Sequence, residues 1–240
     1  MDLSDLLTIV IPCKNEKDII SKTLDLLNHQ TNIHGVKVVV CDSSNDGITK
    51  PSLLDRLEYD AITDNFNLYL IQGGLPATAR NNGFKLVSTP YVLFMDADIF
   101  LLDSELLNNV VSKIKNEDLD LVSLRFRTDN GDYNYVYKIF DILQKLSMLI
   151  SPFCLGGFML TKSSKFKDIG GFDEEAKIAE DYVYSKQIKR NMFGIHNAFL
   201  YTSPRRFHNK GLWYMTKLMI ESVINKNNKE YFKDSKSYWS

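Results

Sequence analysis

The sequence predicts an α/β fold in which helices flank a mostly parallel central sheet, and three observations support this prediction. Short apolar runs in the first half are rich in β-branched residues, and they are too short for helices. Each run is apolar at successive positions, which is typical of strands buried on both faces of a sheet. Amphipathic helical patterns separate the runs and give a doubly wound, Rossmann-like order with right-handed crossovers. The four runs are Thr8–Ile11, Val36–Cys41, Asn67–Ile71 and Tyr91–Met95.

The helices of the first half can be placed from their apolar faces and their caps. Asn15 is expected to cap the first helix, with Asp18 completing a capping pair. A later helix should begin at Asp103 or Ser104. Its predicted buried face consists of Leu107, Val110, Val111 and Ile114.

The second half is less regular, but no linker separates it from the first. We therefore expect one domain over residues 1–240, made of two halves (about 1–125 and about 126–211) and a basic helical tail (212–240). The predicted elements are a helix near Tyr133–Ile150, a strand near Phe158–Thr161, a helix from about Glu180 to Arg190, a strand near Ile195–Thr202 and a helix after Gly211.

Composition excludes several classes of protein. The 29 basic and 30 acidic side chains nearly cancel, which argues against a nucleic-acid binder that must neutralise phosphates. The run Tyr135–Leu160 is the most membrane-like segment, but charged residues interrupt it. The acidic N-terminus is unlike a signal peptide, and Cys13 and Cys41 lie in apolar runs where thiols are small buried residues. We expect a cytoplasmic protein.

Polar residues follow three of the predicted strands where each one ends. They are Pro12–Glu16, Asp42–Gly47 and the triplet Asp96-Ala97-Asp98. Ligands of doubly wound sheets bind at this edge. The first turn lacks G-x-G-x-x-G, and the chain contains no G-x-x-x-x-G-K-[ST]. With both glycine-rich phosphate loops excluded, the remaining interpretation is a nucleotide site that holds its phosphates through a metal ion.

Two acidic pairs are candidates for the chemistry. Asp96 and Asp98 directly follow an apolar strand and supply hard oxygen ligands for Mg²⁺ or Mn²⁺. The alternative is that they only cap the next helix. Glu180 and Asp181 can provide a general base, although acids at the start of a helix also stabilise it through its dipole.

A basic cluster, Arg205-Arg206-x-His208-x-Lys210, forms a third candidate. Guanidinium groups bind phosphate oxygens bidentately, and His208 could be a further metal ligand. The alternative is a solvated basic loop, which we accept for Lys210. Alternating Tyr133, Tyr135 and Tyr137 could stack on an acceptor sugar, but core packing is favoured at this spacing.

Taken in order, these motifs resemble glycosyltransferase family 2, whose members have the GT-A fold. The resemblance extends over residues 9–181 and reaches Arg205 and Arg206. The motifs are Ile9-Val-Ile-Pro-Cys-Lys-Asn-Glu16, Cys41-Asp-Ser-Ser-Asn-Asp-Gly47, Ala79-Arg-Asn-Asn-Gly83, Asp96-Ala-Asp98, Gly156-Gly-Phe158 and Glu180-Asp181.

The resemblance implies that the first half (about 1–125) binds the nucleotide sugar and that the second (about 126–211) is the acceptor and catalytic half. Pro12 and Glu16 would line the nucleoside pocket, and Asp42 would hydrogen-bond the base. Arg80 would lie near the base or the diphosphate. Ser43 stands where the family usually has a second acid, so the base-binding role falls to Asp42 alone.

It also implies roles closer to the reacting sugar. Asp96 would approach the ribose or sugar, with Ala97 beside it, and Asp98 would bind the metal. Asp181 would be the catalytic base, with Glu180 next to it. Donor contacts are further implied for Gly156 and Gly157, whose backbone would approach the sugar or the acceptor, and for Arg205 and Arg206.

We therefore predict a metal-dependent glycosyltransferase that moves one sugar from a nucleotide-diphosphate sugar, such as a UDP- or GDP-sugar, to an acceptor hydroxyl with inversion. The acceptor would be a glycan, a lipid-linked molecule or a small molecule. The Q-x-x-R-W motif of processive synthases is absent, which favours single-sugar transfer. The alternatives are a nucleotidyltransferase acting on a sugar phosphate and a non-catalytic sugar-nucleotide or glycan-binding module.

The C-terminal segment carries an excess of positive charge, which suggests a peripheral contact with an anionic membrane. From Arg205 onward eight basic residues face three acidic ones. The basic residues are Arg205, Arg206, Lys210, Lys217, Lys226, Lys229, Lys233 and Lys236.

Overall fold

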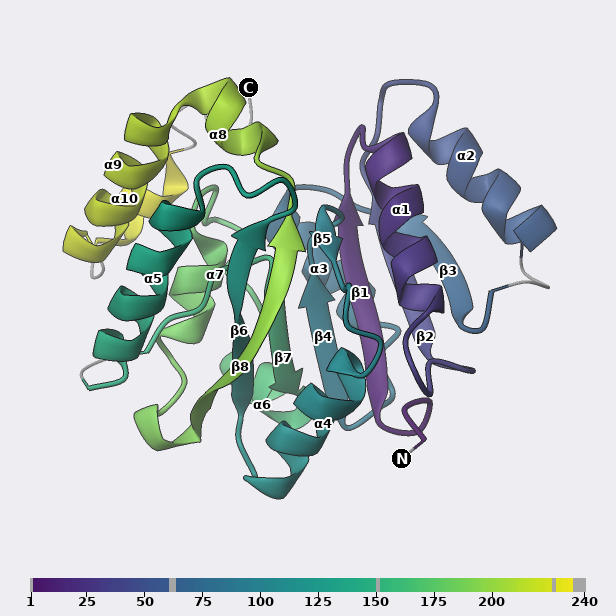
Figure 1. The fold of residues 1–240 in the computed structure, drawn as a ribbon, viewed down its shortest axis with the longest axis horizontal. Helices are drawn as coiled ribbons and strands as arrows, with labels where there is room; N and C mark the ends of the chain where they lie inside the picture. The colour runs from purple at the N-terminus through teal and green to yellow at the C-terminus, as the bar shows by residue number, and fades with distance from the viewer. Residues whose placement is uncertain (1, 61–63, 150–151, 226–227, 235–240) are drawn as a thin grey trace.

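The computed structural model describes residues 2–60, 64–149, 152–225 and 228–234. An eight-stranded mixed sheet, in the order β3-β2-β1-β4-β7-β6-β8-β5, runs through both halves of the sequence with helices on either side (Figure 1). The first half supplies a parallel block whose strands are β1 (Leu7–Cys13), β2 (Lys37–Asp42), β3 (Asn67–Gln72) and β4 (Tyr91–Met95).

The remaining four strands extend the sheet beside β4 and run in both directions. β7 pairs antiparallel with β4 and with β6, whereas β6 and β8 are parallel to each other, and β5 closes the far edge against β8. The four strands are β5 (Ile99–Phe100), β6 (Leu121–Thr128), β7 (Phe158–Lys162) and β8 (Phe193–Thr202).

The helices and helical turns account for most of the remaining described residues. They are α1 (Lys17–Asn28), α2 (Thr49–Asp55), the π-helical turn η1 (Arg56–Asp60), α3 (Pro76–Phe84), α4 (Leu106–Asn116), α5 (Asn134–Ser147), α6 (Ser163–Ile169), α7 (Glu180–Ser185), the 3₁₀ turn η2 (Arg190–Met192), α8 (Arg205–Lys210), α9 (Leu212–Ile224) and α10 (Lys229–Lys233).

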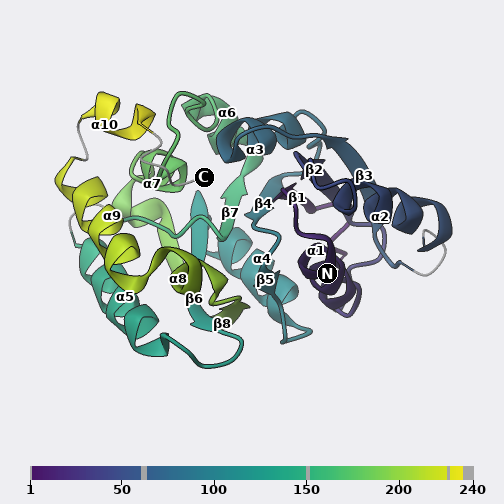
Figure 2. The ribbon, with the colours of Figure 1, turned by 90° about the horizontal axis from the view of Figure 1, so that it is seen from above.

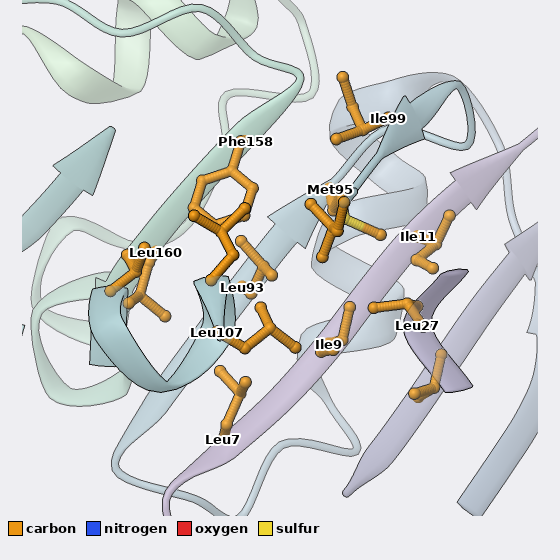
Figure 3. Close-up of a cluster of buried hydrophobic side chains, with 14 of the residues drawn as sticks. Leu7, Ile9, Ile11, Leu27, Leu93, Met95, Ile99, Leu107, Phe158 and Leu160 are labelled. Carbon is orange, nitrogen blue, oxygen red and sulfur yellow. The ribbon is translucent and has the colours of Figure 1, made fainter. Parts of the chain in front are cut away.

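Alternation along the central strands divides the core between the two faces of the sheet. Leu7, Ile9 and Ile11 of β1 belong to a large cluster that includes Leu27 of α1 and Leu107 of α4 (Figure 3). The intervening Val10 points to the opposite face, where α3, α6 and α7 pack. A methyl group on Gly83 of α3 would lie 2.3 Å from Cγ1 of Val10, so glycine permits this close approach. The two core clusters, one on each face of the sheet, fix the positions of the carboxyl ends of β1, β2 and β4.

The predicted strands of the first half are confirmed, as is the buried face of Leu107, Val110, Val111 and Ile114, but this helix begins at Leu106 rather than at Asp103 or Ser104. The burial of β3 was expected to match the others, but β3 lies at the sheet edge, where several of its side chains are exposed. The predicted helix over residues 180–190 is too long, because α7 ends at Ser185.

The capping prediction for the first helix is wrong. Glu16 is the N-cap residue of α1, and no side chain caps this helix. Asn15 instead adopts a left-handed φ of 56°, and its side-chain oxygen accepts hydrogen bonds from the backbone N–H groups of Asn45 and Asp46. The amide therefore joins the loops that follow β1 and β2.

The three cysteines are buried and reduced, in agreement with their interpretation as small core residues. Burial raises the pKa of both Cys13 and Cys41 to about 12, which keeps these thiols protonated. Among the described residues no helix is long and apolar enough to span a bilayer.

Candidate active site

The loops that follow β1, β2 and β4 meet at one edge of the sheet. The N–H of Ser43 donates to the carbonyl of Cys13 (2.9 Å), and the N–H of Asp96 donates to the carbonyl of Gly157 (3.1 Å). Pro12, half-buried near the end of β1, is in register with Cys41 of β2. The predicted donor-binding segments therefore lie side by side, as expected for parallel strands that end at a common edge.

Asp42 is buried at the end of β2 and organises the loop after it. One carboxylate oxygen accepts hydrogen bonds from the N–H (3.1 Å) and the hydroxyl (2.5 Å) of Ser44. This fixes Asp42 next to the loop that Asn15 also holds. The role of Asp42 in binding a base stays a prediction.

Asp96, Ala97 and Asp98 form a tight turn between β4 and β5. The N–H of Ile99 donates to the carbonyl of Asp96 (3.2 Å), and the hydroxyl of Thr23 donates to the carbonyl of Ala97 (2.5 Å). The side chain of Ala97 is in the core cluster, so its contribution to the turn is its small size rather than a polar contact. The Asp98 side chain is only 8% exposed.

Arg80 forms the electrostatic centre of the site. It is buried on α3 and donates from Nη1 to Oε1 of Glu180 (2.5 Å) and from Nη2 to Oδ1 of Asp96 (2.6 Å). Its guanidinium also lies over the ring of Phe172, 5.4 Å from the centroid. Burial alone would lower the pKa of Arg80, but the two carboxylates raise it overall, so the group stays charged.

This pairing was not foreseen in the sequence. Arg80 was expected near the base or the diphosphate, whereas the structure pairs it with two protein carboxylates. No local pattern links residues that are 100 positions apart. Only the need of buried acids for a cation could have suggested the pairing.

Asp181, the predicted base, lies at the start of α7 against the backbone of Gly156. A Cβ on Gly156 would be 2.9 Å from Oδ2 of Asp181 and 3.0 Å from its Cβ. The N–H of Tyr182 donates to Oδ1 (2.8 Å). Burial, and then the neighbouring charge of Glu180, raise the pKa of Asp181 to about 7. A carboxylate with such a pKa can accept a proton near neutral pH.

The two adjacent glycines have different surroundings. Gly156 makes room for Asp181, while a Cβ on Gly157 would lie 2.8 Å from Cε1 of Phe126 and 2.9 Å from Cδ1 of Ile99. Gly157 is therefore a packing position beneath the site. Contact of either backbone with a sugar stays a prediction.

Arg205 reaches across the site from α8, the short helix after β8. Its Nη2 contacts the carboxylate of Glu16 and lies 3.5 Å from Oδ2 of Asp98. The guanidinium thus stands between the loop after β1 and the turn after β4. The side chain of Arg206 lies outside the described part of the structure.

His208 is on the same helix but is not brought to Asp98. Its side chain is half-exposed, with Nε2 3.6 Å from Oδ2 of Asp132 and its ring against the edge of Tyr133. Within the described residues, no group of three or more His, Cys, Asp and Glu side chains is arranged to hold a metal ion. The metal roles of Asp98 and His208 stay predictions.

The chemistry of Asp98 nevertheless fits a divalent cation. Its carboxylate is a hard oxygen donor in a nearly buried position, and a cationic guanidinium already lies 3.5 Å away. A carboxylate that already attracts one cation, and that offers hard oxygen atoms, is the kind of ligand that Mg²⁺ and Mn²⁺ prefer.

Comparison with known proteins agrees with this geometry. Residues 8–170 match the model of Glycosyl transferase family 2. The poly(ribitol-phosphate) beta-glucosyltransferase of Bacillus spizizenii is 30% identical over 186 residues, which are 75% of this chain and 28% of that protein. The O-antigen chain rhamnosyltransferase RfbN of Salmonella typhimurium is 24% identical over 201 residues, 76% of this chain and 61% of RfbN. The chain is thus similar to only part of each relative.

Solved structures share the architecture at low sequence identity. The mannosyltransferase PcManGT from Pyrobaculum calidifontis, in complex with GDP-Man and Mn²⁺, has a TM-score of 0.68 at 18% identity, covering 90% of this chain and 64% of that one. S. aureus TarS 1–349 in complex with UDP-GlcNAc has a TM-score of 0.60 at 19% identity, covering 82% and 58%. These likenesses confirm the GT-A fold. Because the family model matches more than half of the sequence, the chain belongs to glycosyl transferase family 2.

Proposed function

We propose that this protein transfers one sugar from a nucleotide-diphosphate sugar to an acceptor hydroxyl, with inversion, and that Asp181 is the general base. The observation that carries the proposal is the position of Asp181. It packs on Gly156 within reach of the charge of Asp96 in the β4 turn, with a pKa of about 7. Its carboxylate accepts the proton of the acceptor hydroxyl. The hydroxyl oxygen bonds to the anomeric carbon, and the bond to the diphosphate breaks.

Charge balance around the base supports this assignment. Burial and then the charge of Glu180 keep the pKa of Asp181 raised, while Arg80 neutralises part of the acidic charge of Glu180 and Asp96. Arg80 is a positioning residue, since its two ion pairs hold the acids of α7 and of the β4 turn together. Such a preorganised arrangement lowers the cost of rearranging charges during the reaction.

The leaving diphosphate needs positive charge. Arg205 lies 3.5 Å from Asp98 and can bind phosphate oxygens bidentately once a donor enters. Asp98 would hold Mg²⁺ or Mn²⁺, which supplies a Lewis acid for the diphosphate. PcManGT was solved with GDP-Man and Mn²⁺ and TarS with UDP-GlcNAc, which supports a UDP- or GDP-sugar as the donor class.

The names of the relatives support a glycan or polymer acceptor. They include a poly(ribitol-phosphate) glucosyltransferase and an O-antigen chain rhamnosyltransferase. We extend only the acceptor class to this chain, because it matches just 28% and 61% of those two proteins.

The deciding experiment separates donor binding from transfer. Calorimetry with a panel of nucleotide sugars, with and without Mn²⁺, first identifies the donor. Asp181→Asn should then bind this donor with nearly unchanged affinity but lose turnover by about 10²- to 10⁴-fold. The exposed Asp55→Asn on α2 is the matched control. Near-normal turnover of Asp181→Asn would show that another group is the base.

A further inference from the structure

Helix α5 turns its apolar side chains outward. Tyr135, Ile139, Ile142, Leu143, Leu146 and, just past the helix, Leu149 are each 47–69% exposed. Spacings of three and four residues place them along one helical face. Both views show α5 at the outer edge of the molecule (Figures 1 and 2). We call these six residues the α5 stripe.

The inward side of α5 places two buried polar residues beside the apolar Val136 and Tyr137, whereas such a side is usually apolar throughout. The buried Asp141 accepts a hydrogen bond from Nη2 of Arg127 on β6 (2.7 Å). The buried Gln144 donates to the carbonyl of Phe153 (3.1 Å) and to the hydroxyl of Ser123 (3.3 Å). These bonds fix the rotation of the helix, so the stripe cannot turn inward without breaking a buried ion pair.

The charges around the stripe are positive. Lys138 and Lys145 are exposed on α5, and the single acid of this helix, Asp141, points inward. Arg190 joins them at the C-terminal end, where its Nη1 donates to the carbonyl of Leu149 (2.9 Å). An apolar stripe bordered by basic residues matches the hydrocarbon and the negative head groups of an anionic lipid surface.

The neighbouring helix α9 also carries exposed apolar side chains. Figures 1 and 2 both show α9 beside α5. Its Trp213 is 77% exposed and its Ile224 is 74% exposed. The α8 segment joins the two helices to the site, since Phe207 stacks on Tyr133 next to α5 while Arg205 contacts Glu16.

We propose that the α5 stripe docks this protein on the surface of an anionic lipid bilayer, with α5 lying along the head-group boundary. The area argues against a second copy of the chain as the occupant. A helix of 14 residues is about 21 Å long and about 10 Å wide, so it offers about 200 Å². A stable interface needs about 800 Å² on each partner, which α5 and α9 together do not approach. This proposal does not rest on the proposed transfer reaction.

The test is co-sedimentation of the full chain with vesicles of equal parts phosphatidylcholine and phosphatidylglycerol, and with vesicles of phosphatidylcholine alone. The wild type should bind the anionic vesicles, and high salt should weaken this binding. Ile142→Glu/Leu146→Glu should lower the affinity by at least about tenfold, because it places two carboxylates within the stripe. Lys138→Glu/Lys145→Glu should also lower the affinity for anionic vesicles, by about fivefold for each lysine removed.

The matched control is Ile48→Glu/Leu54→Glu on and next to α2, where the two side chains are 56% and 48% exposed and lie at the other end of the sheet (Figure 1). This variant should bind vesicles like the wild type. Circular dichroism and thermal melting establish that all three variants are folded.

Three outcomes overturn the proposal. The first is a wild type that binds neither kind of vesicle. The second is undiminished vesicle binding by folded Ile142→Glu/Leu146→Glu, which would assign the membrane contact to the basic C-terminal tail instead. The third is a dimer, measured by light scattering, that this variant converts to a monomer, which would identify the stripe as a contact between copies. Donor-binding calorimetry on the same variants should be unchanged, so a failure here leaves the proposed reaction untouched.

Discussion

Arg80 and Glu180 are 100 positions apart in the sequence, yet Nη1 of Arg80 lies 2.5 Å from Oε1 of Glu180. Arg80 comes from α3 and Glu180 begins α7. With its second nitrogen on Asp96 of the β4 turn, Arg80 joins the acids contributed by the two halves of the chain. One buried cation thereby determines both the position and the charge of the acidic site.

Replacement of Arg80 should destabilise the fold severely. Arg80→Leu leaves Glu180 and the partly buried Asp96 without this cation, and loss of one partner of a buried ion pair costs about 3–5 kcal/mol. Urea unfolding followed by circular dichroism measures this free energy. Lys113→Ala is the control, because its pair with Glu117 is a surface i,i+4 contact worth about 0.3–0.5 kcal/mol. Similar losses in both variants would mean that the Arg80 ion pairs add little.

The raised pKa of Asp181 also predicts a pH-dependent stability. Its value is about 7 in the folded protein against an ordinary value of 3.8, so the unfolded carboxyl ionises first as the pH rises. The folded state then loses stability between about pH 4 and pH 7. Asp181→Asn lacks this loss. Its melting temperature should match the wild type near pH 4 and exceed it increasingly up to pH 7, with no further gain above.

The comparison needs the variant Asp55→Asn, which removes an exposed carboxylate from α2. Its melting curve should follow the wild type throughout the range. A difference between Asp181→Asn and the wild type that stays constant from pH 4 to pH 8 would contradict the raised pKa.

An added methyl group should impair turnover at Gly156 but stability at Gly157. In Gly156→Ala the new Cβ would lie 2.9 Å from Oδ2 of Asp181 and displace the base, so turnover should fall at least about tenfold with little change in donor affinity. In Gly157→Ala the Cβ meets Phe126 and Ile99, and this overpacking should cost about 1–3 kcal/mol of stability. Steady-state kinetics and urea unfolding on both variants measure the contrast. Equal effects on both quantities would refute it.

Much of the fold was predictable because the signals that define it are local. Apolar runs located β1, β2 and β4, and the spacing of Leu107 and Val110 located α4. The edge position of β3 depends on strand order, which no single run encodes. The candidate site shows the same division. Asp96 and Asp98 could be identified as site candidates because they directly follow a strand. Their ion-pair partners come from other parts of the chain and could not be predicted.

The surroundings of His208 and the α5 stripe depend on tertiary packing rather than on local sequence. The contacts of His208 with Asp132 and Tyr133 are set by tertiary packing, which the local sequence does not encode, and its metal role stays a prediction. The tyrosines before and within α5 were interpreted as core residues. Tyr133 and Tyr137 do pack on Phe207, but Tyr135 is exposed. Polar anchors at Asp141 and Gln144 fix the rotation of α5, and periodicity alone cannot reveal which face turns inward.

Arg205 should compete with a metal ion in the absence of a donor. Its guanidinium lies 3.5 Å from Asp98 and also contacts Glu16. It therefore neutralises part of the negative charge that would attract a metal ion. Arg205→Ala leaves both carboxylates more negative. Because the pair is partly exposed, we expect an increase in Mn²⁺ affinity of only about threefold to tenfold, measured by calorimetry without nucleotide.

Donor binding should change in the other direction. A diphosphate loses a bidentate cation in Arg205→Ala, so affinity for the nucleotide sugar should fall although Mn²⁺ binds more tightly. Lys217→Ala, which removes an exposed charge from α9, should alter neither quantity. Asp98→Ala should abolish the Mn²⁺ signal of the free protein. If Arg205→Ala bound Mn²⁺ no better than the wild type while Asp98→Ala still bound it, the cation would lie elsewhere and Arg205 would serve only to hold Glu16 and Asp98 together.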